Sequence, residues 1–386
     1  MNVTLPEPTI PEQQHSAKLH ARIAAQIQLK GPLSFARFME MALYEPRLGY
    51  YRAGWPTFGK NGDFITAPEI SSLFGCCVAR QCEQVLREFK QASIIELGAG
   101  SGALSVQILT ELEKRHCLPA HYYILELSAQ FQQRQRDTLK KMVPHLFSKV
   151  EWLSTLTPAL CDGIVIANEV LDAMPVHQFR IENQRILECV VTCDEKKKLF
   201  IRSAISNTSF FIEKIKALQL EHIEGYTSEI NLWLEPWLRT IAQAIKRGCL
   251  LFIDYGFPQH EYYLSQRYMG TLMCHYKHHA HADPLILLGV QDITAHVDFT
   301  AVANAANSLG LTVAGFTHQA AFLLNCGLLD EINSNQNDRI RFQQVQAIKQ
   351  LTLPHEMGEL FKVIALTKGD MPALLGFSQF NQVERL

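Results

Sequence analysis

Three glycines at alternate positions mark the part of the sequence with the most evident chemistry. They end the segment Ile94-Ile95-Glu96-Leu97-Gly98-Ala99-Gly100-Ser101-Gly102, which begins as an apolar strand and precedes the helical stretch 104–114. Glycine has no Cβ, so the backbone can turn sharply there and come close to a ligand. The pattern predicts a ligand-binding turn between a strand and a helix.

Two classes of cofactor fit this turn. The letters match the dinucleotide pattern G-x-G-x-x-A, with Glu126, 24 residues after Gly102, as the acid that binds a ribose. Glu96 favours S-adenosylmethionine, because an acid two residues before Gly98 suits a cofactor that carries a cation and no pyrophosphate. Glu126 would then accept hydrogen bonds from the ribose hydroxyls of an adenosine. A nicotinamide-dependent oxidoreductase and a purely structural turn stay open as alternatives.

A second polar group follows the apolar run 163–167. Asn168 and Glu169 come directly after it, and Asp172 follows three residues later, at the edge where such sheets bind ligands. We expect Asn168 to contact the cofactor. Carboxylates can accept the paired hydrogen bonds of a guanidinium, so Glu169 is the expected orienting group for such an acceptor and Asp172 the second. The alternative is that an acid here caps the next helix.

Asp63, Thr66 and Glu69 form a third group, in a loop that also contains Gly59 and Gly62. Such a loop can fold over a bound cofactor, and we expect the three side chains to lie at that site. Turn or cap roles are the alternative for each residue.

Histidines and tyrosines supply weaker signals. His296 is a candidate general base with Asp298 as its orienting partner, although a hydrogen-bonded structural histidine fits equally. Tyr50 and Tyr51 could stack on a guanidinium or pack as a buried pair. Four closely spaced histidines between residues 275 and 281 could suggest a metal site. No acid or thiolate completes a recognisable set of ligands, so we expect a mobile polar loop and no metal there. That group contains His275, His278, His279, His281 and Asp283.

The elements that must position these residues are short apolar runs alternating with helical segments, which is typical of a parallel sheet covered on both faces. Helices are indicated at 17–30, 34–43, 74–89, 104–114 and 298–309. The fold class expected is α/β, a doubly wound and mostly parallel sheet of Rossmann type. The seven runs are 93–97, 122–127, 150–153, 163–167, 249–255, 311–317 and 362–367.

The domain plan has three parts. Residues 1–14 are expected to form a loose leader, 15–90 an N-terminal helical cap with a lid loop, and 91–386 the catalytic domain. Insertions are expected at about 176–228 and 256–297, the first as a hairpin turning at Glu182-Asn183-Gln184.

Composition excludes several classes of protein. A net charge of −2 argues against nucleic-acid binding, which needs a surplus of Lys and Arg on one face. The ten cysteines include no C-x-x-C pair, so we expect reduced thiols in a cytoplasm. The apolar runs are too short for a membrane span, and residues 1–14 resemble neither a signal nor a transit peptide.

Several longer segments are much more specific, namely 49–51, 62–71, 167–176, 292–299 and 357–363. Together they resemble the MidA family. The resemblance implies a class I methyltransferase core, S-adenosylmethionine as cofactor and, as in the mitochondrial members that assist assembly of respiratory complex I, an arginine of a protein as acceptor. A complex I subunit is then the expected partner, and an assembly factor that keeps the pocket without catalysis is the alternative. Ala99 and Ser101 stand where the family commonly has Pro and Arg.

Overall fold

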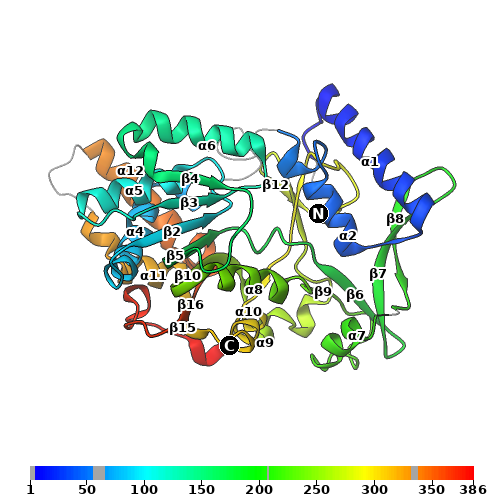
Figure 1. The fold of residues 1–386 in the computed structure, drawn as a ribbon. Coiled ribbons are helices and arrows are strands. Elements are labelled where there is room, and N and C mark those ends of the chain that lie inside the picture. Colours follow the sequence, from blue (N-terminus) through cyan, green and yellow to red (C-terminus); the bar gives the residue numbers. More distant parts are fainter. Residues whose placement is uncertain (1–4, 55–65, 207, 332–337) are drawn as a thin grey trace. The chain divides into compact units, whose positions relative to one another are not determined.

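The computed structural model describes residues 5–54, 66–206, 208–331 and 338–386 (Figure 1). Contacts within the chain define two compact units. The parallel-sheet unit consists of residues 65–171, 235–258 and 297–386, and the antiparallel unit consists of residues 1–64, 172–234 and 259–296.

The parallel-sheet unit is built on one large sheet. Numbered along the chain, seven of its strands lie in the order 3-2-1-4-5-7-6 (Figure 1). The first five are parallel to one another, while the seventh, β16, is antiparallel to both β10 and β15. A short strand, β14 (Val297–Asp298), pairs with the end of β10. The seven strands are β2 (Ala92–Leu97), β3 (Tyr122–Leu125), β4 (Val150–Leu153), β5 (Cys161–Asn168), β10 (Ile245–Phe257), β15 (Thr312–His318) and β16 (Phe361–Lys368).

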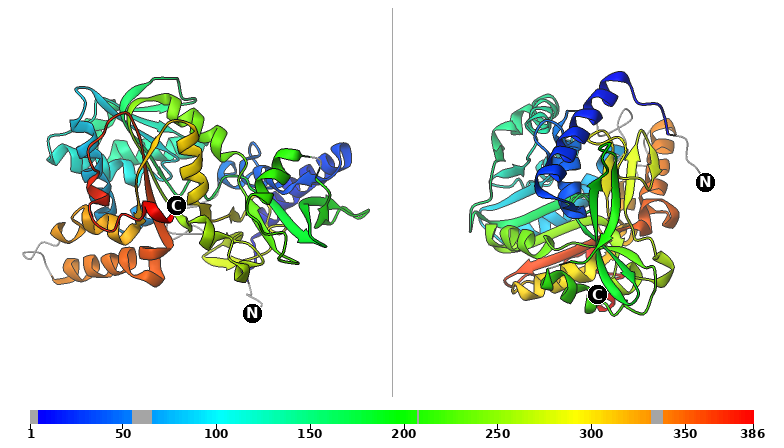
Figure 2. Two further views of the ribbon diagram at one scale, coloured as in Figure 1. Left: turned by 90° about the horizontal axis from the view of Figure 1, so that it is seen from below. Right: turned by 90° about the vertical axis from the view of Figure 1, so that its right-hand side faces the viewer.

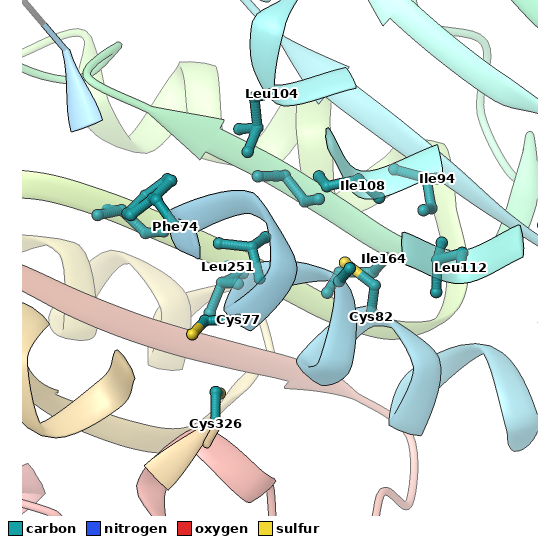
Figure 3. Packing of buried hydrophobic residues seen from close by; sticks show 14 of the residues in the cluster. Phe74, Cys77, Cys82, Ile94, Leu104, Ile108, Leu112, Ile164, Leu251 and Cys326 are labelled. Atoms are coloured by element: carbon teal, nitrogen blue, oxygen red, sulfur yellow. The ribbon is translucent and has the colours of Figure 1, made fainter. Parts of the chain in front are cut away.

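All seven apolar runs identified in the sequence form strands, and burial on both faces of the sheet explains why they read as continuous runs. Ile94, Ile164 and Leu251, from three neighbouring strands, lie in one cluster with side chains of α4 and α5 (Figure 3). The next residue along β10, Phe252, instead packs its ring on Trp237 of α8, with centroids 5.5 Å apart. Successive strand residues point to opposite faces, so helices cover the sheet on both sides.

Eight helices belong wholly or almost wholly to this unit among the described residues. The sequence predicted α4, α5 and α10 to within two residues at each end. The eight are α3 (Ala67–Ile70), α4 (Ser72–Arg87), α5 (Ala103–Lys114), α6 (Ala129–Met142), α8 (Leu234–Ala244), α10 (Phe299–Ser308), α11 (Gln319–Asn325) and α12 (Asp338–Thr352). Short helical segments are Pro144–Lys149, Leu328–Glu331, Pro354–Gly358, Leu375–Phe377 and Val383–Arg385.

The antiparallel unit contains two smaller sheets. One has the order β1-β7-β6-β9 with β8 also on β7, and the other has the order β12-β11-β13. Helices α1 and α2 lie beside the first sheet in both views of Figure 2, and their buried side chains share one core with it. The strands are β1 (Leu33–Ser34), β6 (His177–Glu182), β7 (Arg185–Cys193), β8 (Leu199–Ala204), β9 (Thr227–Ile230), β11 (Met273–Tyr276), β12 (His279–His281) and β13 (Asp292–Thr294). The helices are α1 (Ile10–Lys30), α2 (Phe35–Tyr44), α7 (Ser209–Lys216) and α9 (Gln259–Tyr262), with single turns at Tyr50–Arg52 and Ser265–Arg267.

The predicted hairpin in the first insertion is present. Strands β6 and β7 join at Asn183 and Gln184, which have φ of 51° and 59°. Two consecutive left-handed residues match the right-handed twist of the flanking strands.

Three features differ from the sequence predictions. Helix α1 starts at Ile10, inside the expected loose leader, because Thr9 and Glu12 form a reciprocal capping box and Pro11 suits the first turn. Helix α4 groups with the parallel sheet and not with α1 and α2, since its apolar face enters the cluster of Figure 3. The histidine-rich segment forms the hairpin β11–β12, turning at Lys277 and His278, and not an irregular loop.

Among the described residues, no helix is both long enough and apolar enough to cross a bilayer.

Candidate functional site

Three strands of the parallel sheet end in register at one edge. Leu97 of β2 lies opposite Leu125 of β3 and Ala167 of β5, and Asn168, the last residue of β5, lies opposite Ile253 of β10. The strand order reverses between β2 and β5, and open α/β sheets bind ligands at the carboxyl ends of strands beside such a reversal. The glycine turn and the segment from Asn168 therefore stand at the place where this fold class holds its ligand.

The glycine turn has the backbone conformation that its sequence predicts. Gly98, Gly100 and Gly102 have φ of 63°, 53° and 84°. A Cβ on Gly98 would lie 3.2 Å from Cγ2 of Val170, and one on Gly102 would lie 3.3 Å from Cα of Gln135. Both the left-handed conformation and the close approach of neighbouring segments thus require glycine here.

Glu126 follows β3 and is held by groups on both oxygens. The Ser128 backbone N–H donates to Oε1 at 2.9 Å, and Nε2 of Gln135 donates to Oε2 at 3.0 Å. The same Nε2 donates to the carbonyl of Gly100 at 3.1 Å. The structure therefore brings the predicted ribose ligand and the glycine turn together through Gln135, which sequence reasoning did not identify.

Glu96 lies in the interior beneath the turn. Only 2% of its surface is exposed, and its carboxyl accepts hydrogen bonds from the hydroxyls of Ser105 and Tyr122. Burial is the largest cause that raises the pKa of Glu96, and the charge of Glu126 adds to it; against the lowering effect of the two hydroxyls the pKa is about 7. A carboxyl that is partly protonated at neutral pH and bonded inside the core is not well suited to pair with a cofactor cation, and that role stays a prediction.

The turn after β5 is strained and firmly held. Glu169 has a φ of 54°, which is uncommon for a residue with a side chain. Its N–H donates to the carbonyl of Ile253 at 2.9 Å. The next two N–H groups, of Val170 and Leu171, donate to Oδ2 of the fully buried Asp254 at 3.1 and 2.9 Å.

Asn168 presents an acceptor without a partner. Its Nδ2 donates to Oε1 of Glu169 at 3.0 Å, which fixes the amide orientation. Its Oδ1 is buried and has no hydrogen-bond partner among the described residues. A buried carbonyl oxygen without a donor costs free energy, so a ligand that supplies an N–H or O–H fits this position.

Glu69 also reaches the glycine turn. Its carboxylate accepts a hydrogen bond from the Ser101 hydroxyl, and the neighbouring Pro68 carbonyl accepts one from Nε2 of Gln107 at 2.8 Å. Thr66 is the N-cap residue of α3, and its carbonyl accepts from the N–H of Glu69 at 2.9 Å. The predicted Asp63 lies outside the described residues.

A cavity of about 550 Å³ opens beside the hydrogen bond between Glu69 and Ser101. It is lined by side chains of α4, α5 and α6 together with Glu69, Ser101 and Ala103, and does not include Gly98, Glu126, Asn168 or Glu169. It therefore borders the glycine turn at Ser101 but does not reach the other residues at the strand ends.

Asp172 and His296 belong to the antiparallel unit. Asp172 is 6% exposed, and its carbonyl accepts from the N–H of Ala295 at 3.0 Å. The N–H of His296 donates to Oγ1 of Thr271 at 3.1 Å. Asp298, the predicted partner of His296, instead caps α10 by accepting from the N–H of Ala301 at 3.0 Å.

The tyrosine pair is packed within that unit. Tyr50 is fully buried, with its ring 5.0 Å from that of Tyr51. Tyr51 stacks on Tyr44 at 5.5 Å and donates its hydroxyl to both oxygens of the buried Asp292 at 3.0 Å. Burial first, and then the charges of Asp292 and Asp172, raise the pKa of Tyr51 well above its ordinary value. Sequence reasoning did not single out Asp292.

No group of three or more His, Cys, Asp or Glu side chains in the described part of the chain is arranged to hold a metal ion.

Comparisons with known proteins show the family to which the chain belongs. The model of a family described as S-adenosyl-L-methionine-dependent methyltransferases, Methyltransf_28, matches residues 77–317. A crystal structure from Burkholderia thailandensis, solved with bound S-adenosyl-homocysteine, is 37% identical, covers 99% of this chain and 100% of its own, and superposes with a TM-score of 0.94.

More distant relatives carry a more specific name. "Protein arginine methyltransferase NDUFAF7, mitochondrial" of Danio rerio is 27% identical, with 89% of this chain and 85% of that protein aligned. The Drosophila melanogaster homologue is 28% identical over 96% of this chain and 89% of its own.

The fold, the glycine turn and the bound product in the Burkholderia structure define the class: an S-adenosylmethionine-dependent methyltransferase of the α/β type. Within that class the chain belongs to the Methyltransf_28, or MidA, family.

Proposed function

We propose that this methyltransferase transfers a methyl group to an arginine of a protein substrate, with a respiratory complex I subunit as the candidate, and that Glu169 orients the acceptor. The names of the zebrafish and fruit fly relatives support this acceptor. The proposal gives Asp172 and His296 secondary roles in acceptor binding and proton transfer.

The observation that carries the proposal is the conformation of Glu169. A left-handed φ of 54° costs free energy, and such strain persists only where surrounding contacts enforce it, often at functional sites. Here the contacts are those of Ile253 and Asp254 described above. They hold the backbone of Glu169, and the next residue, Val170, approaches the glycine turn, with its Cγ2 3.2 Å from the Cβ position of Gly98.

The residues at the strand ends fit the cofactor. We assign Gly98, Gly100 and Gly102 to the close approach of the cofactor and Glu126 to its ribose hydroxyls. The Oδ1 of Asn168 would accept a hydrogen bond from an N–H or O–H group of the cofactor. Glu69 and Thr66 would anchor the segment beside the glycine turn. When bound, S-adenosylmethionine supplies an electrophilic methyl group on a sulfonium sulfur.

The acceptor needs help from the protein. A guanidinium has a pKa above about 12, so it is charged and a poor nucleophile. A carboxylate that accepts two of its hydrogen bonds directs lone-pair density to one terminal nitrogen and holds that nitrogen in line with the methyl group. Lysine would not use such a carboxylate in the same way, because an ammonium is a point charge.

The test is methyl transfer from isotope-labelled cofactor to the candidate subunit and to its Arg→Lys variants. Glu169→Gln should retain affinity for S-adenosylhomocysteine and lose roughly 100-fold or more in turnover, because a contact made in the transition state is removed. Glu235→Gln, in a surface ion pair on α8, is the matched control and should keep full turnover.

Each other outcome has a distinct meaning. Label on lysine, on a small molecule or on nucleic acid would overturn the arginine assignment. Full turnover in Glu169→Gln would overturn the role of Glu169. Tight binding of S-adenosylhomocysteine without turnover on any protein would favour the non-catalytic assembly factor.

A further inference from the structure

Gln135 is fully buried and stands at the centre of a hydrogen-bond network in the parallel-sheet unit. Its Nε2 donates to the Gly100 carbonyl at 3.1 Å and to Oε2 of Glu126 at 3.0 Å, while its Oε1 accepts from Nε1 of Trp152 at 2.9 Å. One amide thus joins the glycine turn, the end of β3 and the strand β4.

The partners leave one possible orientation of this amide. Two of them, the Gly100 carbonyl and the Glu126 carboxylate, only accept hydrogen bonds, and the Trp152 indole only donates. A flipped amide would set its oxygen against the carboxylate and its NH2 group against the indole N–H. The network therefore has a single satisfied arrangement, and it holds Oε2 of Glu126, while the Ser128 N–H holds Oε1.

Packing holds the backbone of Gln135 and its partner Trp152 in place. The backbone of Gln135 lies so close to Gly102 that a Cβ on the glycine would be 3.3 Å from Cα of Gln135. The guanidinium of Arg136 lies over the Trp152 ring, 3.9 Å from its centroid. Helix α6 is thereby fixed against the turn at the residue that carries the amide.

We propose that Gln135 is a positioning residue for the cofactor: it fixes the Glu126 carboxylate relative to the glycine turn and so sets the affinity for the ribose hydroxyls without contacting the cofactor. The inference rests on the proposed role of Glu126 as the ribose ligand. It predicts that a change at Gln135 alters recognition of the hydroxyls specifically, whereas a purely structural residue would alter binding of all ligands alike.

The experiment measures calorimetric affinity for S-adenosylhomocysteine and for its 2′-deoxy analogue. The wild-type protein should prefer the former by roughly 10-fold, as expected for one hydrogen bond to a charged group. In Gln135→Leu, which removes the donor, that preference should fall to about twofold.

Gln135→Glu supplies a second readout in a nearly isosteric side chain. At pH 5 the introduced carboxyl is protonated and can still donate to Glu126, so affinity should remain close to that of the wild type. As the pH rises to 8 the introduced carboxyl ionises, and two adjacent carboxylates repel, so affinity should fall by roughly 10-fold more than in the wild type. Gln133→Glu, the same change at an exposed position of α6, is the control and should follow the wild-type pH profile.

The outcomes separate this inference from the proposed function. The positioning role is overturned if Gln135→Leu keeps the wild-type preference for the ribose hydroxyl. It is also overturned if the pH profile of affinity of Gln135→Glu equals that of Gln133→Glu. Either result leaves the methyltransferase assignment standing. Absence of any binding of S-adenosylhomocysteine to the wild-type protein would instead refute the proposed function itself. Should Gln135→Leu not fold, the pH profile of Gln135→Glu decides.

Discussion

Gly98 meets two requirements that valine cannot meet, a φ of 63° and an approach to Val170. Gly98→Val should abolish measurable binding of S-adenosylhomocysteine and lower the free energy of unfolding by about 1–2 kcal/mol or more. Gly310→Val is the matched control, because Gly310 has a φ of 73° but open space around its Cβ position. It should lose similar stability and keep its affinity. Calorimetry and denaturant unfolding measure the two effects, and equal affinities in both variants would contradict a role of the turn in binding.

Glu96 should make stability depend on pH. Its pKa of about 7 in the folded protein exceeds the value of about 4.5 expected in the unfolded chain, so the folded state binds more protons between these two pH values. Stability therefore falls as the pH rises through this window, by about 3 kcal/mol in total. Glu96→Gln should flatten this fall, and Glu88→Gln, at an exposed position, should not. Urea unfolding at pH 5 and pH 7 measures the fall in the free energy of unfolding. An equal fall in the wild type and in Glu96→Gln would refute the raised pKa of Glu96.

Single residues differ in how far the sequence could reveal them. Gly98, Gly100 and Gly102 are visible because alternate glycines directly after an apolar strand are typical of a ligand-binding turn. Gln135 lies in a polar helical segment and carries no such pattern; its importance arises only where α6 packs on the turn. Asp292 lies in a segment that resembles the MidA family, but its bond to Tyr51, distant in the sequence, is visible only in the fold.

At the scale of elements, Asp254 fixes the turn after β5 from the neighbouring strand β10. Asp254→Asn removes the charge that two backbone N–H groups share and should lower the free energy of unfolding by about 1–3 kcal/mol. Turnover should fall as well, because Glu169 loses its support. Asp162→Asn, in an exposed ion pair with Arg247 near the start of β5, should cost less than about 1 kcal/mol and leave turnover unchanged. Equal effects of the two substitutions would argue against this role of Asp254.

Strands were predictable from the sequence because both faces of the sheet are buried, which leaves uninterrupted apolar runs such as 163–167. Helix starts were harder to predict. The capping box of Thr9 and Glu12 is a local signal that was available in the sequence, yet the prolines around it suggested an irregular leader. The hairpin β11–β12 was missed because its side chains are mainly polar, and its turn uses Lys277 and His278 in left-handed conformations, which glycine or asparagine adopts more readily.

Binding of S-adenosylhomocysteine, the product formed from the cofactor, should stabilise the folded protein as a whole. S-adenosylhomocysteine at one hundred times its Kd should raise the free energy of unfolding by about 2.7 kcal/mol, by mass action on the folded state. NADH at millimolar concentration should have no effect. Thermal unfolding with each ligand is the measurement, with Gly98→Val as the variant that should show no shift. Stabilisation by NADH alone would restore the oxidoreductase alternative.

Domain organisation was the least predictable level. The sequence suggests a cap followed by a catalytic domain with two insertions, whereas the contacts join residues 1–64 with both insertions into one unit. Local patterns do not reveal this grouping, because it depends on contacts such as that of β1 with β7, between residues far apart in the chain.

Strand β16 has a consequence for biosynthesis. It comes last among the seven strands but lies between β10 and β15, and it supplies partners to both. During synthesis on a ribosome, one edge of β10 would stay unpaired, and β15 would have no neighbour in the sheet, until residues 361–368 had emerged. A nascent chain therefore exposes an apolar strand edge until late in its synthesis, and a premature stop before Phe361 would leave that edge open to other chains.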